Sequence, residues 1–262
     1  MASIKAKGLT VAFPLYHGSA RSLKKQVFNR TGLRRDKDTS RLEVTAISNL
    51  TFDIASGDRV ALQGRNGAGK STLLSTLLGI YMPVAGRLEI EGQVDGLLNI
   101  SAGMDMSANA FENIELHCLM RGVPPQKRRA LRQEIVEFTE LGDFLSLPLR
   151  TYSSGMMLRL AFAMKTAVAP QILLMDEWIL AGDASFVTRA EERLTGLINQ
   201  CEILVLATHN TKIANKWCNR HFNMESGKLV SITVPDPESV DDDVRLVRIA
   251  EEGRGAGARL RG

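Results

Sequence analysis

The chain has 262 residues, 44 % of them hydrophobic, and a formal net charge of +4, so it is long enough for one large domain, or a main domain with a smaller lobe. No apolar run approaches the roughly 18 residues that cross a bilayer, and the N-terminus lacks the apolar core of a signal peptide, so any link to a membrane is expected to use a partner. The three cysteines, Cys118, Cys201 and Cys218, show neither metal-ligand spacing nor an even disulfide framework, and are predicted to be reduced structural thiols.

Alternating apolar and polar residues predict strands over 4–13 and 42–54, and these flanking strands favour a small antiparallel sheet. Between them lies a basic insertion, about 17–41, with eight Lys or Arg residues and two Asp residues, a net charge of +6. It could face anionic lipid head groups or an acidic partner, or be a solvated loop, and its composition does not decide between these. Nucleic acid is not an expected partner, because the insertion has one aromatic residue, Phe28, and matches none of the usual recognition motifs.

Residues 64–71 read GRNGAGKS and fit the phosphate-binding pattern G-x-x-x-x-G-K-[ST] at every required position. The motif follows an extended apolar stretch at 59–62 and opens onto a helix-like run at 71–80. A phosphate cradle lies at such a strand-to-helix turn, where the positive end of the helix dipole faces the anion. The sequence therefore predicts a binding site for a nucleoside triphosphate.

Each position of this phosphate loop has a predicted role. Lys70 can reach the outer phosphates, the Ser71 hydroxyl is placed to ligate Mg²⁺, and Thr72 is a second hydroxyl contact. Glycines allow successive backbone N–H groups to turn inward around the phosphates. The residues predicted to form this cradle are Gly64, Arg65, Asn66, Gly67, Ala68 and Gly69.

Two helix-like segments follow, at 108–121 and 126–141. Short uninterrupted apolar runs at 172–175 and 203–207 are typical of parallel strands buried on both faces. This order predicts an α/β fold, in which a nucleotide-binding core with a parallel sheet carries an inserted helical lobe, about 103–165.

The apolar run 172–175 ends in Asp176 and Glu177, at the carboxyl edge of a parallel strand, where ligands of α/β proteins bind. In phosphoryl transfer, Asp176 would organise Mg²⁺ through its water shell, and Glu177 would orient and polarise the attacking water. A second strand, over 203–208, ends in His209. From there, His209 could contact the γ-phosphate and help to fix the water by hydrogen bonding rather than as a metal ligand.

A further motif lies at 152–156, which reads YSSGM and is followed by RLAFA at 159–163. It resembles the signature sequence of ATP-binding-cassette ATPases, whose usual form is LSGGQ. Serine and methionine in place of the first glycine and the glutamine are typical of the ATPase subunits that export polysaccharides such as O-antigen, capsule and teichoic acid. Trp178, where most cassettes have proline, resembles the same subfamily. The resemblance rests on four ordered motifs and runs from about residue 3 to 232.

The resemblance implies an enzyme that binds ATP and Mg²⁺ and works as a head-to-tail dimer. Ser153, Ser154 and Gly155 of one subunit would meet the γ-phosphate held by Lys70 of the other, and Asp183 would couple the two sites across the interface. Closure on ATP and hydrolysis would drive alternating conformations in membrane subunits. The expected function is the ATP-hydrolysing subunit of an exporter, on the cytoplasmic face of the bacterial inner membrane, that moves lipid-linked polysaccharide through a separate permease present in two copies.

Two roles of the family pattern have no single assigned residue in this sequence. Most cassettes have a glutamine roughly 40 residues after the phosphate-loop lysine, but the segment 96–105 contains none, and the residue that takes its role stays open. The interior of 96–122 is expected to contact the permease. The aromatic residue that stacks on adenine would be Phe13, which aligns with the end of the first strand, or Tyr16, unless both simply pack in the core.

The expected organisation is a nucleotide-binding domain over 1–235, with an N-terminal antiparallel β-subdomain, followed by a polar, loosely ordered tail over 236–262. Such a tail is too short and too polar to form the glycan-binding domain that some relatives carry. Two alternatives stay open, an ATPase that exports a drug or a lipid and a soluble ATP-driven clamp. The signature sequence disfavours the first, and the lack of a second cassette or long coiled coils disfavours the second.

Overall fold

The computed structural model describes residues 1–14, 33–35, 42–177 and 184–235. Their chain forms two compact units. The first comprises the described residues of Met1–Gly92, Met175–Trp178 and Glu202–Gly262, and the second those of Gln93–Leu174 and Ile179–Cys201. Several predictions fall outside the described residues: those on Tyr16, on Trp178, on Asp183, on most of the basic insertion and on the tail 236–262.

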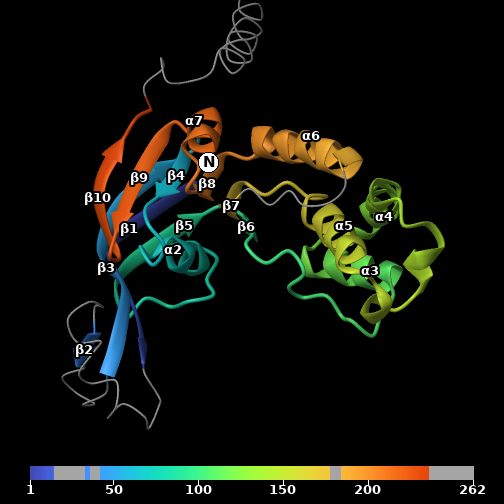
Figure 1. The fold of residues 1–262 in the computed structure, drawn as a ribbon, viewed down its shortest axis with the longest axis horizontal. Coiled ribbons are helices and arrows are strands. Elements are labelled where there is room, and N and C mark those ends of the chain that lie inside the picture. Colours follow the sequence, from blue (N-terminus) through green and yellow to red (C-terminus); the bar gives the residue numbers. More distant parts are fainter. Residues whose placement is uncertain (15–32, 36–41, 178–183, 236–262) are drawn as a thin grey trace, which may run out of the picture. The chain divides into compact units, whose positions relative to one another are not determined.

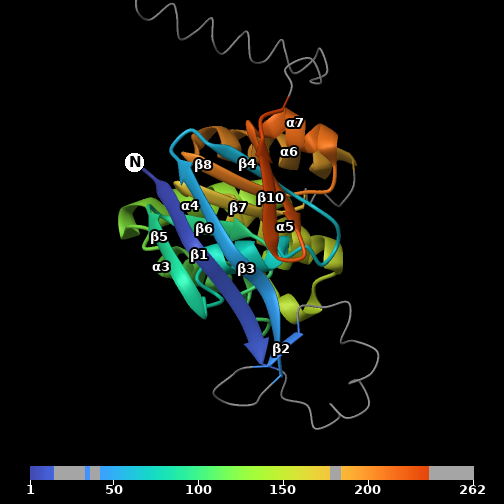
Figure 2. The same cartoon turned by 90° about the vertical axis from the view of Figure 1, so that its left-hand side faces the viewer.

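The first unit contains a four-stranded antiparallel sheet in the order β2-β3-β1-β5. β1 (Ser3–Pro14) lies between β3 (Leu42–Ala55) and β5 (Ala85–Glu91) and is antiparallel to both. Figure 2 shows β1 and β3 as long neighbouring arrows, with the short β2 (Leu33–Arg35) beside the far end of β3. The predicted antiparallel sheet is therefore present, and β2 adds a strand within the basic insertion that the sequence did not indicate.

A second sheet has the strand order β10-β9-β4-β8-β7-β6. β4 is parallel to both β8 and β9, and its central residues, like all five residues of β8, are buried, as expected of strands covered on both faces. The boundary between the two units falls within β7, whose last two residues belong to the first unit. The strands are β4 (Arg59–Gln63), β6 (Val94–Leu97), β7 (Ile172–Asp176), β8 (Ile203–Ala207), β9 (Arg220–Glu225) and β10 (Lys228–Thr233).

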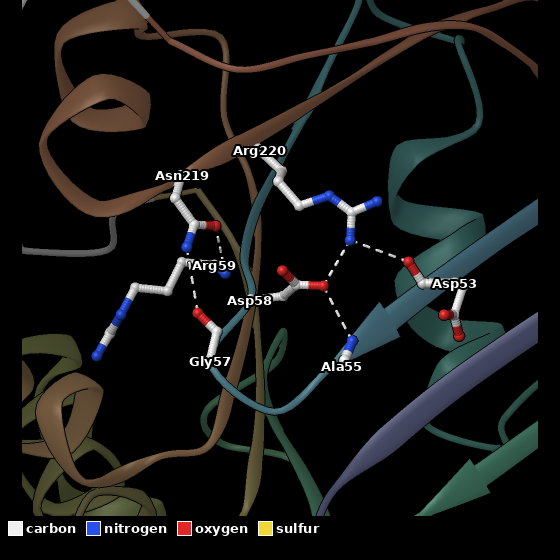
Figure 3. Close-up of polar contacts among 7 residues, drawn as sticks. All are labelled: Asp53, Ala55, Gly57, Asp58, Arg59, Asn219 and Arg220. Carbon is white, nitrogen blue, oxygen red and sulfur yellow. Dashed lines mark hydrogen bonds and ion pairs between the residues drawn. The ribbon is translucent and has the colours of Figure 1, made fainter. Parts of the chain in front are cut away.

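Polar side chains fix the start of β4 against the start of β9 (Figure 3). Arg220 Nη1 donates to Asp58 Oδ2 at 2.5 Å and to the Asp53 carbonyl at 3.0 Å. The Asn219 side chain accepts a hydrogen bond from the Arg59 amide at 2.9 Å and donates to the Gly57 carbonyl at 3.2 Å. Since β4 leads directly into the phosphate loop, these bonds also set where that loop begins.

Two helices of the first unit follow strands of the second sheet. α2 (Lys70–Leu77) comes after β4 and the phosphate loop, and α7 (Thr211–Trp217) comes after β8. Asn210 caps α7, because its side-chain oxygen accepts from the amides of Lys212 and Ile213. Both helices therefore begin close to the carboxyl ends of their strands.

The second unit is mainly helical and contains α3 (Ala110–Met120), α4 (Pro125–Thr139), α5 (Ser154–Lys165) and α6 (Ala184–Gln200), together with two short 3₁₀ helices (Gly142–Ser146 and Leu149–Thr151). A capping box begins α3. Asn109 Oδ1 accepts from the Glu112 amide at 3.0 Å, and the Glu112 carboxylate accepts from the Asn109 amide at 2.8 Å. The predicted helical lobe, about 103–165, lies within this unit.

The described part of the chain contains no helix with the length and apolar character needed to cross a bilayer. All three cysteines are buried and free, as predicted.

Candidate functional site

The phosphate loop turns sharply between β4 and α2, and two glycines make the turn possible. Gly64 has φ +146°, and a Cβ there would lie 2.2 Å from the Met224 carbonyl oxygen. Gly69 has φ +101°, and a Cβ there would lie 2.8 Å from the Ala46 carbonyl oxygen. Because the backbone at both positions lies so close to these carbonyl oxygens, only glycine, which has no Cβ, fits there.

A cleft of about 490 Å³ opens beside this loop within the first unit. The loop contributes Asn66–Thr72 to the lining, and the end of β7 contributes Asp176 and Glu177. The structure thus brings most of the predicted phosphate loop, Asp176 and Glu177 to one cavity, whereas the predicted His209 is not among the residues that line it. Gly64 and Arg65 instead line a neighbouring cavity that also contains Asn66–Ala68.

Another part of the cleft lining was not identified from the sequence. It consists of Val44–Ala46 from β3 and of Ser226 and Gly227 from the turn between β9 and β10. The Gly227 amide donates to the Ala68 carbonyl at 3.0 Å, which joins the turn to the phosphate loop. Ser-Gly between two apolar-rich segments is a turn signal, but nothing in the local sequence places that turn beside the phosphate loop.

Lys70 is the only side-chain cation among the described residues that line the cleft. Its Nζ donates to the Gly64 carbonyl at 2.7 Å and to the Arg65 carbonyl at 3.2 Å. Ser71 and Thr72 follow in the first turn of α2 and line the same cleft. An ammonium group, two hydroxyls and the amides of a helix start therefore converge there, and this combination suits a polyphosphate.

Glu177 and His209 lie side by side, although they follow different strands. His209 Nδ1 is 3.0 Å from Glu177 Oε1, and both side chains are mostly exposed. The Glu177 amide donates to the Ala207 carbonyl at 2.8 Å, and Glu177 has φ +64°, an uncommon conformation for a residue with a side chain. The adjacent β7 and β8 therefore place the predicted carboxylate and imidazole where both could hold one water molecule.

The residues predicted to hold Mg²⁺ fit that ion chemically. Ser71 and Asp176 line the same cleft, and hydroxyl and carboxylate oxygens are ligands that Mg²⁺ prefers. Within the described ranges, no group of three or more His, Cys, Asp or Glu residues is arranged to hold a metal by itself. Two protein groups, the Ser71 hydroxyl and Asp176 acting through water, agree with the usual mode of Mg²⁺ binding, in which substrate phosphates and water complete the shell.

Phe13, the favoured adenine-stacking residue, is not among the residues that line the cleft. It pairs across the sheet with Val44, which does line it, and its ring contacts Tyr81 edge-on at a centroid distance of 4.9 Å. Because Tyr16 lies outside the described residues, the choice between Phe13 and Tyr16 stays a prediction.

The signature residues lie in the second unit, at the start of α5. Ser153 is the N-cap of this helix, and its Oγ accepts from the Met156 amide at 3.2 Å. Ser153, Ser154 and Gly155 are all exposed and do not line the cleft of the first unit. They are available to a separate ligand or partner.

The segment without the usual glutamine borders a second cavity, of about 260 Å³, inside the second unit. Arg121 and Asp95 form an ion pair in its lining. His117, also in the lining, is buried, and this burial together with the charge of Lys165 lowers the pKa of His117 from 6.5 to about 4. His117 is therefore neutral at neutral pH.

The chain is similar to one protein-family model and to proteins named for O-antigen and teichoic acid export. A family model described as ABC transporter matches residues 47–180. The O-antigen export system ATP-binding protein RfbE of Yersinia enterocolitica is 43 % identical over 229 residues, which cover 87 % of this chain and 96 % of RfbE. The teichoic acids export ATP-binding protein TagH of Lactococcus lactis is 32 % identical over 89 % of this chain, which spans about half of TagH (49 %).

A similar fold is found among solved structures. The dimeric post-hydrolysis state of the ATP-binding cassette MJ0796, bound to ADP and Pi, matches with a TM-score of 0.64 at 19 % identity, over 88 % of this chain and 98 % of that one. At such low identity the match concerns the fold alone. It confirms the predicted α/β core with an N-terminal antiparallel sheet.

Proposed function

Because the chain belongs to the ABC transporter family, we propose that it is the ATP-hydrolysing subunit of an exporter for lipid-linked polysaccharide. One observation carries the enzymatic part. A single cleft collects Lys70, Ser71, Asp176 and Glu177 from the phosphate loop and the end of β7. The relatives RfbE and TagH, named for O-antigen and teichoic acid export, support the substrate class.

In this proposal the phosphate loop binds ATP. The backbone amides of Gly64–Gly69 surround the phosphates, Lys70 leaves its carbonyl partners to pair with the outer phosphates, and Thr72 adds a hydroxyl contact. Ser71 and Asp176 would hold Mg²⁺, which when bound neutralises charge on the transferring phosphoryl group.

Hydrolysis needs a water molecule opposite the γ-phosphate. Glu177 would orient and polarise this water, and His209, 3.0 Å from the Glu177 carboxylate, would keep that carboxylate in place and contact the γ-phosphate. Both groups are accessible from solvent. We therefore assign enclosure of the reacting water to a second molecule.

We assign that role to a second copy of the chain, as in the dimeric cassette with the similar fold. The exposed Ser153, Ser154 and Gly155 of one subunit would meet the γ-phosphate bound by its partner, and Asp183 would couple the two sites. The dimer would act at the cytoplasmic face of the bacterial inner membrane, on a permease present in two copies that carries the polysaccharide. Residues 96–122 would contact this permease.

The test is deletion of the gene in its host, with complementation by the wild type or by Glu177→Gln. Surface polysaccharide and cytoplasmic lipid-linked glycan are measured in parallel. We expect glycan to accumulate inside the cell and to disappear from the surface, with rescue by the wild type only, because the variant binds ATP without hydrolysing it.

Normal surface glycan in a strain without a redundant exporter would overturn the substrate class. Co-purification with an integral membrane protein would then favour export of a lipid or drug. Failure to co-purify would favour a soluble clamp.

A further inference from the structure

Three helices of the second unit meet around three phenylalanine rings, one from each helix. The rings belong to Phe138 at the end of α4, Phe162 in α5 and Phe186 in α6. Their centroids lie 5.7 to 6.1 Å apart, and Phe162 and Phe186 are almost fully buried. Stacked and edge-on contacts of this kind give a defined packing geometry.

Arginine side chains lie over these rings. The guanidinium of Arg159, from α5, lies 5.2 Å from the Phe186 centroid. From α6, the guanidinium of Arg189 lies 5.6 Å from the Phe138 centroid. Each of these arginines thus lies over a ring of another helix, so the cationic groups of α5 and α6 are gathered beside the end of α4.

One carboxylate, that of Glu140, contacts both arginines. Arg189 Nη1 and Nη2 donate to the two Glu140 oxygens at 2.6 and 2.7 Å, a bidentate arrangement. Arg159 Nη1 lies 3.9 Å from Glu140 Oε2. Glu140 is the C-cap of α4 and has φ +54°, so its left-handed conformation turns the chain at the point where the side chain reaches both guanidinium groups.

The helices that Glu140 links begin at two functional segments. α5 begins with Ser154, and Ser153 is its N-cap. α6 begins at Ala184, directly after Asp183. In the proposed dimer, the first segment contacts the partner's nucleotide and the second couples the two sites. Both therefore need a defined geometry relative to each other.

We propose that Glu140 is a positioning residue for ATP hydrolysis, which holds the signature helix α5 and the helix α6 in one arrangement through Arg159 and Arg189. This inference rests on the proposed function. Without the carboxylate, Arg189 would lose two charged hydrogen bonds and Arg159 would lose the nearby negative charge of Glu140. The aromatic cluster and the buried core of the unit would stay, so the lobe keeps its fold, while the arginines of α5 and α6 lose the charged link through Glu140 that restricts movement of one helix against the other.

The test compares Glu140→Gln with the matched control Glu137→Gln. Glu137 is also a glutamate near the end of α4, and its carboxylate accepts a hydrogen bond from the Gln133 side chain of the same helix at 3.0 Å. Three quantities are measured: binding of a fluorescent ATP analogue to the monomer, ATP-driven dimerisation in a Glu177→Gln background by analytical ultracentrifugation, and the kcat and KM of ATP hydrolysis in the wild-type background.

For Glu140→Gln we expect dimerisation to weaken about tenfold or more and kcat to fall in parallel, from the loss of a charged hydrogen-bond acceptor. Affinity of the monomer for the analogue should stay within about twofold of the wild type, because the phosphate loop lies in the other unit. Glu140→Asp, which keeps the charge, should restore part of the dimerisation. A purely structural role would lower the melting temperature without this split between binding and dimerisation.

If Glu140→Gln fails to fold, Arg189→Lys keeps the positive charge but loses the bidentate geometry, and should show the same split. The inference is overturned if Glu140→Gln and Arg189→Lys dimerise as well as Glu137→Gln. If the Glu177→Gln protein itself does not dimerise with ATP, the proposed function fails instead, so the two failures are distinguishable.

Discussion

In the proposed mechanism, Lys70 contributes the positive charge on which nucleotide binding depends most. The described lining of the cleft contains this one side-chain cation and two carboxylates, Asp176 and Glu177. Polyphosphate entering such a site would be repelled by the carboxylates unless Lys70 and a metal ion compensate for their charge. Lys70 donates to two loop carbonyls, so the proposed binding of ATP would exchange these neutral acceptors for a charged one.

Lys70→Ala should therefore weaken ATP binding by about tenfold to a hundredfold, the loss of a charged hydrogen bond. Isothermal titration calorimetry with ATP and Mg²⁺ measures this change. Lys5→Ala, an exposed lysine on β1, is the control and should bind as the wild type does. Equal affinities of the two variants would refute the role assigned to Lys70.

At the scale of a single element, His117 in α3 makes the stability of the folded protein depend on pH. His117 is 8 % exposed, and burial together with Lys165 lowers its pKa to about 4. Asp95 and Arg121, which also line this cavity, pair with each other. The folded state disfavours the charged imidazole. Above the unfolded-state pKa of 6.5 the histidine is neutral in both states. As the pH falls below 6.5 the unfolded state binds the proton more readily, so the folded protein loses stability.

We predict that the free energy of unfolding decreases between pH 7 and pH 5 more steeply in the wild type than in His117→Leu. The free energy of unfolding of His117→Leu minus that of the wild type should be about 2 kcal/mol larger at pH 5 than at pH 7. Urea unfolding at the two pH values measures this. An unchanged difference would show that His117 titrates normally.

The whole molecule completes its active site through a second copy, according to the proposed mechanism. Glu177 and His209 are open to solvent, and the signature residues Ser153–Gly155 are exposed on a different unit. In the proposal, neither group encloses the γ-phosphate alone. ATP bound between two subunits would bury both groups and exclude bulk water.

Glu177→Gln should bind ATP normally, lower kcat by about a hundredfold or more, and accumulate as a dimer with ATP and Mg²⁺ but not with ADP. Light scattering coupled to size-exclusion chromatography measures the mass. Introducing Ser153→Arg into the same background places a large side chain at the interface and should abolish the dimer. A dimer that persists in this double variant would place the contact elsewhere.

Much of the site could be predicted because its parts are local in sequence. The phosphate loop is eight consecutive residues, 64–71, whose backbone geometry depends on glycines within the motif itself. Asp176, Glu177 and His209 were predicted because each lies at or just after the end of a short buried strand, and adjacent parallel strands end at one edge of a sheet.

Other parts depend on contacts between segments far apart in the chain. The wall formed by Val44–Ala46, Ser226 and Gly227 was missed, although the Ser-Gly turn has a local signal. Likewise, Glu140 and Arg189 are separated by 49 positions, and no periodicity relates them.

The amino-acid sequence alone therefore determined the type of fold, the phosphate loop and the residues at the strand ends, because short-range spacing and backbone conformation are encoded locally. Only the tertiary structure decided which strand and turn face that loop, and which acid links the arginines of α5 and α6. These contacts follow from sheet order and helix packing. Both depend on the burial of many side chains together, so the local sequence around a residue does not determine which distant residue it contacts.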